Sequence, residues 1–376
     1  MQFLEADRLV CDKLLPGLRQ QLGEIPLAEL ESEGSPAIEL FRAHGGTNLL
    51  VPAAYGGPDA TALDAARVVR ALGAVAPSMT VATMMHHFSL GTLFAVAETI
   101  PGLADGMLNR IVDERMLVAS GFAEGRSGRG IFTPTMRAEP VDGGFVINGS
   151  KKPCSLSRSM DLLTASVAVP LPDGSTGMGL LMLPARTPGV SIHPFWSTFT
   201  LAGAESHEVR LTDVFAGPEH LIEPSPQTVA QMDKLTTVGL IWFQLTVCAA
   251  YTGVASALVE KVLERGRGSV SERAALAVRI ETAAALTEGL ARRVMDGEVD
   301  NDTLAASLVT RFAVQDAVCG SAHQAVELLG GMAYIGSSEV AYLLAATHAI
   351  AFHPPSRSST AAGLIDYYAG YPIIVS

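Results

Sequence analysis

Charged and aromatic side chains are scarce in this sequence, and basic residues are fewer than acidic ones. Charged residues make up 17% and aromatic residues 6% of its 376 residues, whereas apolar residues make up 48%, and the formal net charge is −12. Such a composition excludes a disordered chain and allows a large buried core, which at this length is expected to divide between two or three domains. The negative charge argues against nucleic acid as a partner, because phosphate neutralisation needs a basic face.

Cysteines are few and scattered, and no basic and apolar leader precedes the first acidic residues. Cys11, Cys154, Cys248 and Cys319 form no CxxC pair and no metal-like cluster, which predicts buried thiols and no metal site. Reduced thiols and the missing signal peptide together predict a cytoplasmic protein. Residues 235–259 lack charge and are long enough to cross a membrane. Their several polar side chains, and the lack of a second span, favour the central helix of a bundle over a membrane segment.

The strongest catalytic signatures are absent. The sequence has no phosphate-binding GxxxxGK[ST], no HExxH, no GxSxG and no GxGxxG. Residues 125–130 are glycine-rich, but they lead into Phe132 and Thr133 rather than into a helix, so a Rossmann site is not expected. Residues 126–158 are a basic exception on an acidic chain, and either a solvated face or a phosphate-recognition site would account for them.

Hydrophobic periodicity divides the chain into three regions, namely residues 1–115, 116–228 and 229–376. The first region has helical spacing, the second has short β-prone runs between turns, and the third has helical spacing again. We therefore expect an α+β multidomain fold, in which an N-terminal α-helical domain and a C-terminal four-helix bundle flank a small β-barrel or sandwich. The expected helices and strands of the last two regions cover residues 234–264, 271–295, 301–330 and 337–352, and residues 145–147, 162–169, 177–183, 189–193 and 207–211.

Several stretches, in this order along the whole chain, resemble the acyl-CoA dehydrogenase family. They are the Asn-Leu-Leu-Val-Pro-Ala-Ala-Tyr-Gly-Gly of residues 48–57, the Asn-Gly-Ser-Lys of residues 148–151 and the Val-Glu-Leu-Leu-Gly-Gly-Met-Ala-Tyr of residues 326–334. The resemblance implies the helical, β, helical architecture, bound FAD and a homo-oligomer, either a dimer or a tetramer. It also implies an acyl thioester substrate carried by CoA, and the basic residues 126–158 make an acyl carrier protein an alternative carrier. Departures from the family's motifs indicate specialised metabolism.

Two segments of the middle region are similar to the family's flavin-contacting strands. Residues 120–129 resemble the segment that meets the flavin ring, which assigns Phe122, Ala123 and Gly128 to the cofactor. Residues 148–155 resemble the segment whose last hydroxyl lies near the flavin N5. Ser155 keeps that hydroxyl, and Pro153 replaces the usual aromatic residue. Plain strands and turns with exposed side chains are the alternative interpretation of both segments.

The C-terminal region contributes four further residues to the FAD site that the resemblance implies. Arg267 falls near the arginine that contacts the FAD pyrophosphate across a subunit interface, and guanidinium suits two phosphate oxygens. Gly330 and Gly331 match a Gly-Gly that the cofactor approaches closely, although a helix end also explains them. Glu327 stands where the family often has Gln.

The glutamate base of the family is missing. Its usual position falls near Ser356, and its alternative position falls near Phe243, and neither residue can act as a base. His353 is the weak candidate for replacing it, since a histidine at a helix end is often structural. Arg129, which departs from the family pattern, and Phe243 are the expected substrate contacts.

The leading hypothesis is therefore an FAD-dependent acyl-CoA dehydrogenase-like enzyme without the usual base. One alternative is a flavin-dependent oxygenase or oxidase on the same fold, because oxygen activation can dispense with a carboxylate base. A second alternative is a non-catalytic interaction protein that has lost FAD. The fold alone does not choose among them.

Overall fold

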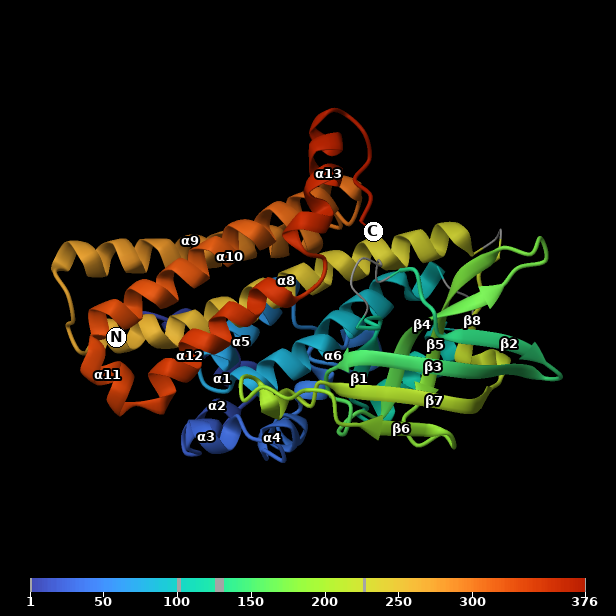
Figure 1. Ribbon diagram of the computed structural model, residues 1–376, viewed down its shortest axis with the longest axis horizontal. Helices are drawn as coiled ribbons and strands as arrows, with labels where there is room; N and C mark the ends of the chain where they lie inside the picture. The colour runs from blue at the N-terminus through green and yellow to red at the C-terminus, as the bar shows by residue number, and fades with distance from the viewer. Residues whose placement is uncertain (1, 100–102, 126–131, 226–227, 376) are drawn as a thin grey trace.

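A computed structural model describes residues 2–99, 103–125, 132–225 and 228–375 (Figure 1). Helices form both ends of the chain, and a single sheet lies between them in sequence, which confirms the expected fold. The division at residues 115/116 and 228/229 stays a prediction, because helices from the two ends of the chain pack against each other and one N-terminal helix also packs against the sheet.

The N-terminal region is built on two long helices that follow a set of short ones. α5 begins at a capping box, in which Thr61 and Asp64 each bond the other's backbone N–H. α6 is buried on almost every side, and Pro77 occupies its first position, where a missing N–H costs nothing. The elements are α1 (Glu5–Leu14), α2 (Leu18–Gly23), α3 (Leu27–Leu30), α4 (Ala37–Ala43), η1 (Gly46–Asn48), η2 (Ala53–Tyr55), α5 (Ala62–Gly73), α6 (Pro77–Val96), η3 (Ala97–Thr99), η4 (Leu103–Leu108) and α7 (Asn109–Asp113).

The middle region forms one eight-stranded sheet with the path β6-β7-β3-β2-β4-β5-β8, and β1 pairs in parallel with β4 beside this path. The turn at Asp142 and Gly143 joins β2 to β3 as an antiparallel hairpin, and Gly143 has the positive φ of 78° that such a turn requires. The elements are β1 (Val118–Gly121), β2 (Arg137–Val141), β3 (Gly144–Cys154), β4 (Leu162–Pro170), β5 (Thr176–Pro184), β6 (Val190–His193), η5 (Ala202–Ala204), β7 (His207–Ala216), η6 (Pro218–His220) and β8 (Leu221–Ile222).

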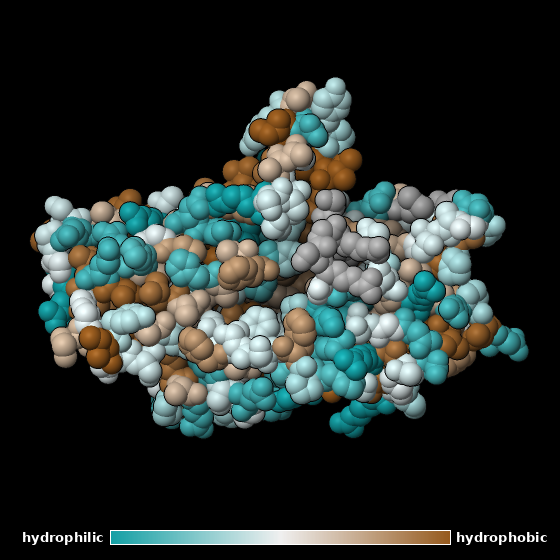
Figure 2. Space-filling view, viewed as in Figure 1, coloured by the Kyte–Doolittle hydropathy of each residue, from teal (hydrophilic) through white to brown (hydrophobic). Residues whose placement is uncertain are grey.

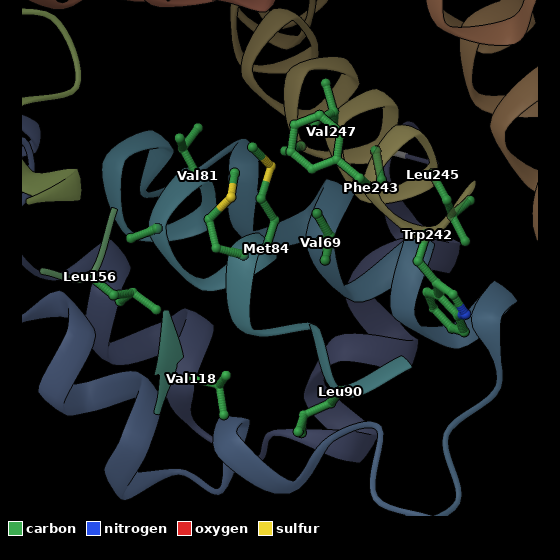
Figure 3. Close-up of a cluster of buried hydrophobic side chains, with 14 of the residues drawn as sticks. Val69, Val81, Met84, Leu90, Val118, Leu156, Trp242, Phe243, Leu245 and Val247 are labelled. Carbon is green, nitrogen blue, oxygen red and sulfur yellow. The ribbon is translucent and has the colours of Figure 1, made fainter. Parts of the chain in front are cut away.

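The C-terminal region is dominated by α8, which packs against α5, α6, α9, α10 and α12. The apolar window of this helix is 94% buried inside the protein, so its composition is that of a core helix. Figure 3 shows Val81 and Met84 of α6 with Phe243 of α8 in this core. The elements are α8 (Val229–Glu264), α9 (Val270–Met295), α10 (Asn301–Leu329), α11 (Gly331–Gly336), α12 (Ser338–His348), η7 (Ala349–Phe352) and α13 (Arg357–Tyr368).

Two glycines let α5 and α8 approach at backbone distance. A Cβ at Gly73 would collide with the carbonyl of Ala250, and a Cβ at Gly253 would collide with the carbonyl of Arg70. This close contact fixes the position of the long α8 against the N-terminal helices.

α13 and the residues after it project from the body of the molecule (Figure 1). Brown, apolar atoms are exposed on and beside this projection in Figure 2. The exposed apolar residues of this part of the chain include Phe352, Ile365 and Ile374. The homo-oligomer expected from the sequence would cover such a surface, and it stays a prediction.

Two adjacent histidines of α6 make stability sensitive to acid. His86 and His87 are fully buried, and burial lowers their pKa values to about 4 and about 3, against the smaller effect of a Thr47 hydrogen bond that raises that of His86. The unfolded chain therefore binds more protons below pH 6.5, and stability falls as pH drops from about 6.5 to about 4. Each histidine contributes a slope of about 1.4 kcal/mol per pH unit.

We expect His87→Leu to lower this acid slope, because leucine fills the apolar site beside Phe41 without titrating. Urea unfolding at pH 7, 6 and 5 measures the slope in each variant. The exposed His323→Leu is the matched control and should keep the parent slope. Equal slopes for His87→Leu and the parent would contradict the assignment.

Candidate functional site

One large cavity, of about 410 Å³, dominates the described part of the molecule. It lies between the ends of β1 and β3, the helices α6 and α8, the irregular segment after β6 and the residues that follow α12. Most of its lining is apolar, with a few hydroxyls, as is usual for small-molecule sites. The lining includes Val81, Met85, Phe88, Thr92, Ser120, Phe122, Ala123, Phe132, Pro153, Ser155, Trp196, Thr200, Leu201, Ser206, Leu235, Gly239, Leu240, Phe243, Tyr251, Ala349, Phe352, His353 and Pro354.

The wall formed by the sheet carries a pair of hydrogen-bonded hydroxyls. Ser155, just after β3, and Ser206, just before β7, share a hydrogen bond of 2.9 Å between their hydroxyl oxygens. Among the described residues neither hydroxyl has another partner, so one of the two O–H hydrogens is left for a ligand. Phe122 and Ala123 continue from β1 along the same wall.

These groups fit the flat ring of a flavin, which has one polar edge and two apolar faces. The hydroxyls of Ser155 and Ser206 and the backbone beyond β1 supply the polar edge. The helices α6 and α8 supply apolar surface opposite it. The donor set therefore fits a ring of this type.

The helical wall is a continuous row of rings. Phe88 of α6 packs edge-to-face on Phe243 of α8, at 5.3 Å between ring centroids, and Phe243 packs on His353 at 6.1 Å. Tyr251, two turns beyond Phe243, packs on His353 at 5.4 Å and joins its Nε2 through the phenol oxygen at 2.7 Å. These contacts hold His353 against the cavity.

His353 is uncharged at neutral pH. Burial lowers the pKa of this imidazole to about 3, and the positive charge of Arg311 lowers it further in the same direction. The titration near pH 6.5 that its ordinary value suggests is therefore not expected. A ring with this low pKa can hydrogen-bond to a reactant, but it is a poor acceptor for a proton.

No carboxylate lines the cavity among the residues that the structure describes. Glu124, close to the cavity in sequence, instead accepts hydrogen bonds from the backbone of Thr135 and Met136 and from the buried Nζ of Lys151 at 2.8 Å. Burial alone would raise the pKa of Glu124, but the bonds from Lys151 and Thr135 outweigh it and lower the pKa to about 2. Glu124 thus has a structural role, because its carboxylate connects the chain before residues 126–131 to the backbone after them.

A second buried carboxylate orders the irregular wall. Glu31 accepts bonds from the backbone and hydroxyl of Ser78 and from the phenol of Tyr342. The Tyr342 oxygen in turn accepts a bond of 3.0 Å from the backbone N–H of Leu201. Within the same segment, the indole N–H of Trp196 donates a hydrogen bond of 2.8 Å to the carbonyl of Thr200. This network connects α3, α6 and α12 to the cavity wall.

The structure gathers many of the residues singled out from the sequence. Those that line this one cavity are Phe122, Ala123, Pro153, Ser155, Phe243 and His353. They come from four separate parts of the chain, so their meeting supports a common site, while the individual roles remain predictions.

Other predicted residues lie elsewhere. Gly128 and Arg129 fall outside the described residues. Ser356 is the N-cap of α13 and accepts a bond from the Ser359 backbone, so the family's usual base position is outside the cavity. Gly330 ends α10 with a φ of 86°, as a helix end requires.

Three more predicted cofactor residues are also remote from the cavity. Arg267 lies in the loop between α8 and α9, and Glu327 is exposed beside His323. Gly331 begins α11. These residues, like Gly330, are outside the cavity lining of the single chain, and their contact with the cofactor stays a prediction.

Sequence reasoning missed several cavity residues. Tyr251 and Gly239 lie eight residues after and four residues before Phe243 on α8, and this helical spacing could have indicated them. Ser206 and Trp196 lie in the segment before β7, which has no periodicity from which to place them.

Comparisons with known proteins agree on the fold and change the interpretation of function. No protein-family model matches the sequence. The chain is 50% identical over 376 residues to isobutylamine N-hydroxylase of Streptomyces viridifaciens, covering 99% of this chain and 100% of that protein. It is 24% identical to cyclohex-1-ene-1-carbonyl-CoA dehydrogenase of Syntrophus aciditrophicus, over 81% of this chain and 75% of that enzyme. Among solved structures, FMN-bound TdsC from Paenibacillus sp. A11-2 superposes with a TM-score of 0.82 at 15% identity, covering 100% and 99% of the two chains.

The leading hypothesis of an acyl-thioester dehydrogenase is wrong. Full-length identity of 50% to an N-hydroxylase overturns it, and the alternative of a flavin-dependent oxygenase on the same fold agrees better. The cavity gives the physical reason, because the described residues offer no carboxylate to remove a proton next to a thioester carbonyl.

Proposed function

We propose that this chain, which belongs to the acyl-CoA dehydrogenase-like flavoprotein superfamily, is a flavin-dependent monooxygenase that converts a small aliphatic primary amine to its N-alkylhydroxylamine. The observation that carries the proposal is the identity of 50%, over essentially the whole of both chains, to isobutylamine N-hydroxylase. The balanced reaction takes the amine, O₂, two electrons and two protons. One oxygen atom enters an N–H bond, and the other leaves as water.

The flavin, in its reduced form, would supply the two electrons that oxygen activation needs. On the sheet side, the backbone beyond β1 at Phe122 and Ala123, with the hydroxyl of Ser155, would hold the ring edge. FAD is the flavin that the sequence resemblance implies. Its adenylate would then meet Arg267 and the Gly330 region of a second copy.

The chemistry of the cavity suits an amine in its uncharged form. The nitrogen must carry a free lone pair to take up oxygen, and an ammonium ion has none. Transfer of a cation into an apolar cavity without a carboxylate is costly, so the site favours the free base over the ammonium ion. Leu235, Gly239 and Phe243 of α8 form the apolar surface that would receive the alkyl group.

We expect the protein, supplied with reduced flavin and O₂, to convert isobutylamine to N-isobutylhydroxylamine. Mass spectrometry after reaction with isotopically heavy O₂ should place one labelled atom in the product. Catalase is included and a sample without the protein is run in parallel, because reduced flavin alone makes hydrogen peroxide. A protein that binds flavin but hydroxylates none of a series of small primary amines would contradict the proposal.

The same assay has an expected pH profile. The free-base fraction of an alkylamine rises about tenfold per pH unit below its pKa, which is near 10.4 as for lysine. The rate at limiting amine should follow this rise without a step between pH 5 and 8, because the pKa of His353 is about 3. A plateau reached near pH 7 would show that an enzyme group, rather than the amine, controls the profile.

A further inference from the structure

Arg311, on α10, is a buried cation without an acidic partner. Its side chain is 1% exposed, and among the described residues no carboxylate forms an ion pair with it. One guanidinium nitrogen donates to the side-chain oxygen of Gln315 at 3.1 Å, and Nε has no partner. Burying an unpaired guanidinium costs desolvation free energy, so the buried position of Arg311 calls for a structural or functional explanation.

The surroundings of Arg311 offer no compensating charge. The ionisable groups near it are the thiols of Cys248 and Cys319, the phenol of Tyr251, the imidazole of His353 and the guanidinium of Arg357. Burial raises the pKa values of Cys248, Cys319 and Tyr251, so these three groups stay neutral. Arg357 is itself paired with Asp316 at 2.6 Å. Among the described residues, no carboxylate therefore pairs directly with Arg311.

The contact that accounts for Arg311 is with the backbone of η7. Its second terminal nitrogen donates to the carbonyl of Ile350, in the single turn that follows α12. Carbonyls at the end of a helix lack intrahelical partners and carry partial negative charge, so a cation suits this place. Ala349, Phe352, His353 and Pro354 of the same segment line the cavity. Arg311 thus holds the short stretch of backbone that brings His353 to the site.

Tyr251 determines which nitrogen of His353 carries hydrogen. The phenol is fully buried, and among the described residues its only hydrogen bond is the 2.7 Å contact with Nε2 of His353. A buried O–H needs an acceptor. The contact satisfies the phenol if Tyr251 donates to Nε2, and the hydrogen of a neutral imidazole then lies on Nδ1.

We propose that Arg311 is a positioning residue, which fixes the backbone at Ile350 and, together with Tyr251, presents His353 to the cavity as a neutral ring with its hydrogen on Nδ1. His353 is then a hydrogen-bond donor to an oxygen atom of the reactants and is not a base. The charge of Arg311 has a second effect in the same direction, because it opposes protonation of the ring beyond what burial alone achieves. The consequence for turnover rests on the proposed function, whereas the state of the ring does not.

Nitrogen NMR of histidine-labelled, flavin-free protein tests the state of the ring directly. We expect His353 in the parent to show Nδ1 protonated and Nε2 unprotonated, without change from pH 8 to pH 5. Tyr251→Phe should lose this preference and populate both tautomers. A parent in which Nε2 carries the hydrogen, or in which His353 gains a proton between pH 8 and pH 5, overturns the proposal.

Two substitutions at Arg311 separate its charge from its geometry. Arg311→Met removes both and should let His353 gain a proton at a higher pH than in the parent. It should lower kcat roughly 100-fold, as a displaced reacting group does, with a smaller change in KM for the amine. Arg311→Lys keeps the charge but lacks the planar fork, so the ring should stay neutral while kcat still falls.

Thermal unfolding accompanies these measurements, because loss of a buried unpaired charge need not destabilise the fold. A folded Arg311→Met protein with the kcat and histidine spectrum of the parent overturns the proposal. Should Arg311→Met fail to fold, Arg311→Lys and Tyr251→Phe still decide it. A parent with the expected ring spectrum but no amine hydroxylation would refute the proposed function and leave the assignment of Arg311 intact.

Discussion

Butyryl-CoA and octanoyl-CoA are expected to leave the flavin of this protein oxidised. Removal of a proton next to the thioester carbonyl needs a positioned carboxylate, and the described lining of the cavity has none. Ser356 is outside the cavity, Phe243 cannot accept a proton, and the pKa of His353, about 3, makes its neutral ring a weak base. A positioned base typically contributes 10²–10⁴-fold, so reduction should be slower than in a dehydrogenase by at least that factor.

Anaerobic mixing of the flavin-bound protein with each thioester, followed at the flavin absorbance band, measures this rate. Dithionite added to the same sample should bleach the band at once, which shows that the bound flavin can be reduced. Rapid bleaching by either thioester would contradict the prediction, and would return the acyl thioester to consideration as a substrate.

The sequence predicted the order of helical and β regions, because each helix and strand has a local apolar pattern. The helices expected over residues 234–264, 271–295 and 301–330 agree with α8, α9 and α10, because apolar periodicity and helix-end residues are local signals. The strands expected at residues 162–169, 177–183 and 189–193 agree closely with β4, β5 and β6, whereas those at residues 145–147 and 207–211 cover only part of β3 and β7. The strands β1, β2 and β8 were not expected. Residues 145–147 belong to the longer β3, whose Gly149 and Lys151 interrupt the apolar pattern while pairing with β7.

The site was only partly predictable, because its members meet through tertiary packing. Phe122 and Ser155 were found from a resemblance, and helical spacing from Phe243 could have added Tyr251. The segment that carries Trp196 is irregular, and Glu31 and Tyr342, which fix it, are remote in sequence, so no local pattern connects them. Arg311 was not found either, since a single arginine in a long helix has no sign of burial.

The error in function has a physical origin as well. The sequence showed that the glutamate base was missing, and it did not show what chemistry replaced the base. The motifs at residues 48–57 and 326–334 belong to the scaffold, which several reactions share. The residues that distinguish those reactions are expected at the cavity, whose described lining has no carboxylate. The lost carboxylate was thus better evidence for oxygen chemistry than the retained motifs were for dehydrogenation.

The size of the amine is expected to be set at Gly239, and Gly239→Val should exclude isobutylamine while still accepting ethylamine. Gly239 lies one turn before Phe243 on the cavity face of α8. A Cβ there would meet only the side chain of Thr92, at 3.6 Å, which is an ordinary contact. The two further methyl groups of valine would then occupy space that the alkyl group needs. One or two methylenes in an apolar pocket change selectivity roughly 10–200-fold, and the ratio of kcat/KM for isobutylamine to that for ethylamine should fall by this amount.

Two variants separate loss of space from loss of fold. Gly239→Ala adds only the tolerated Cβ and should keep most activity, with stability raised by about 0.5–1 kcal/mol, since alanine favours a helix over glycine. Gly289→Val places the same side chain on the exposed face of α9, where nothing lies within 4 Å of the added Cβ, and should leave the ratio unchanged. If Gly239→Val lowered kcat/KM equally for both amines, the alkyl group would not lie against α8, and the orientation proposed for the substrate would be wrong.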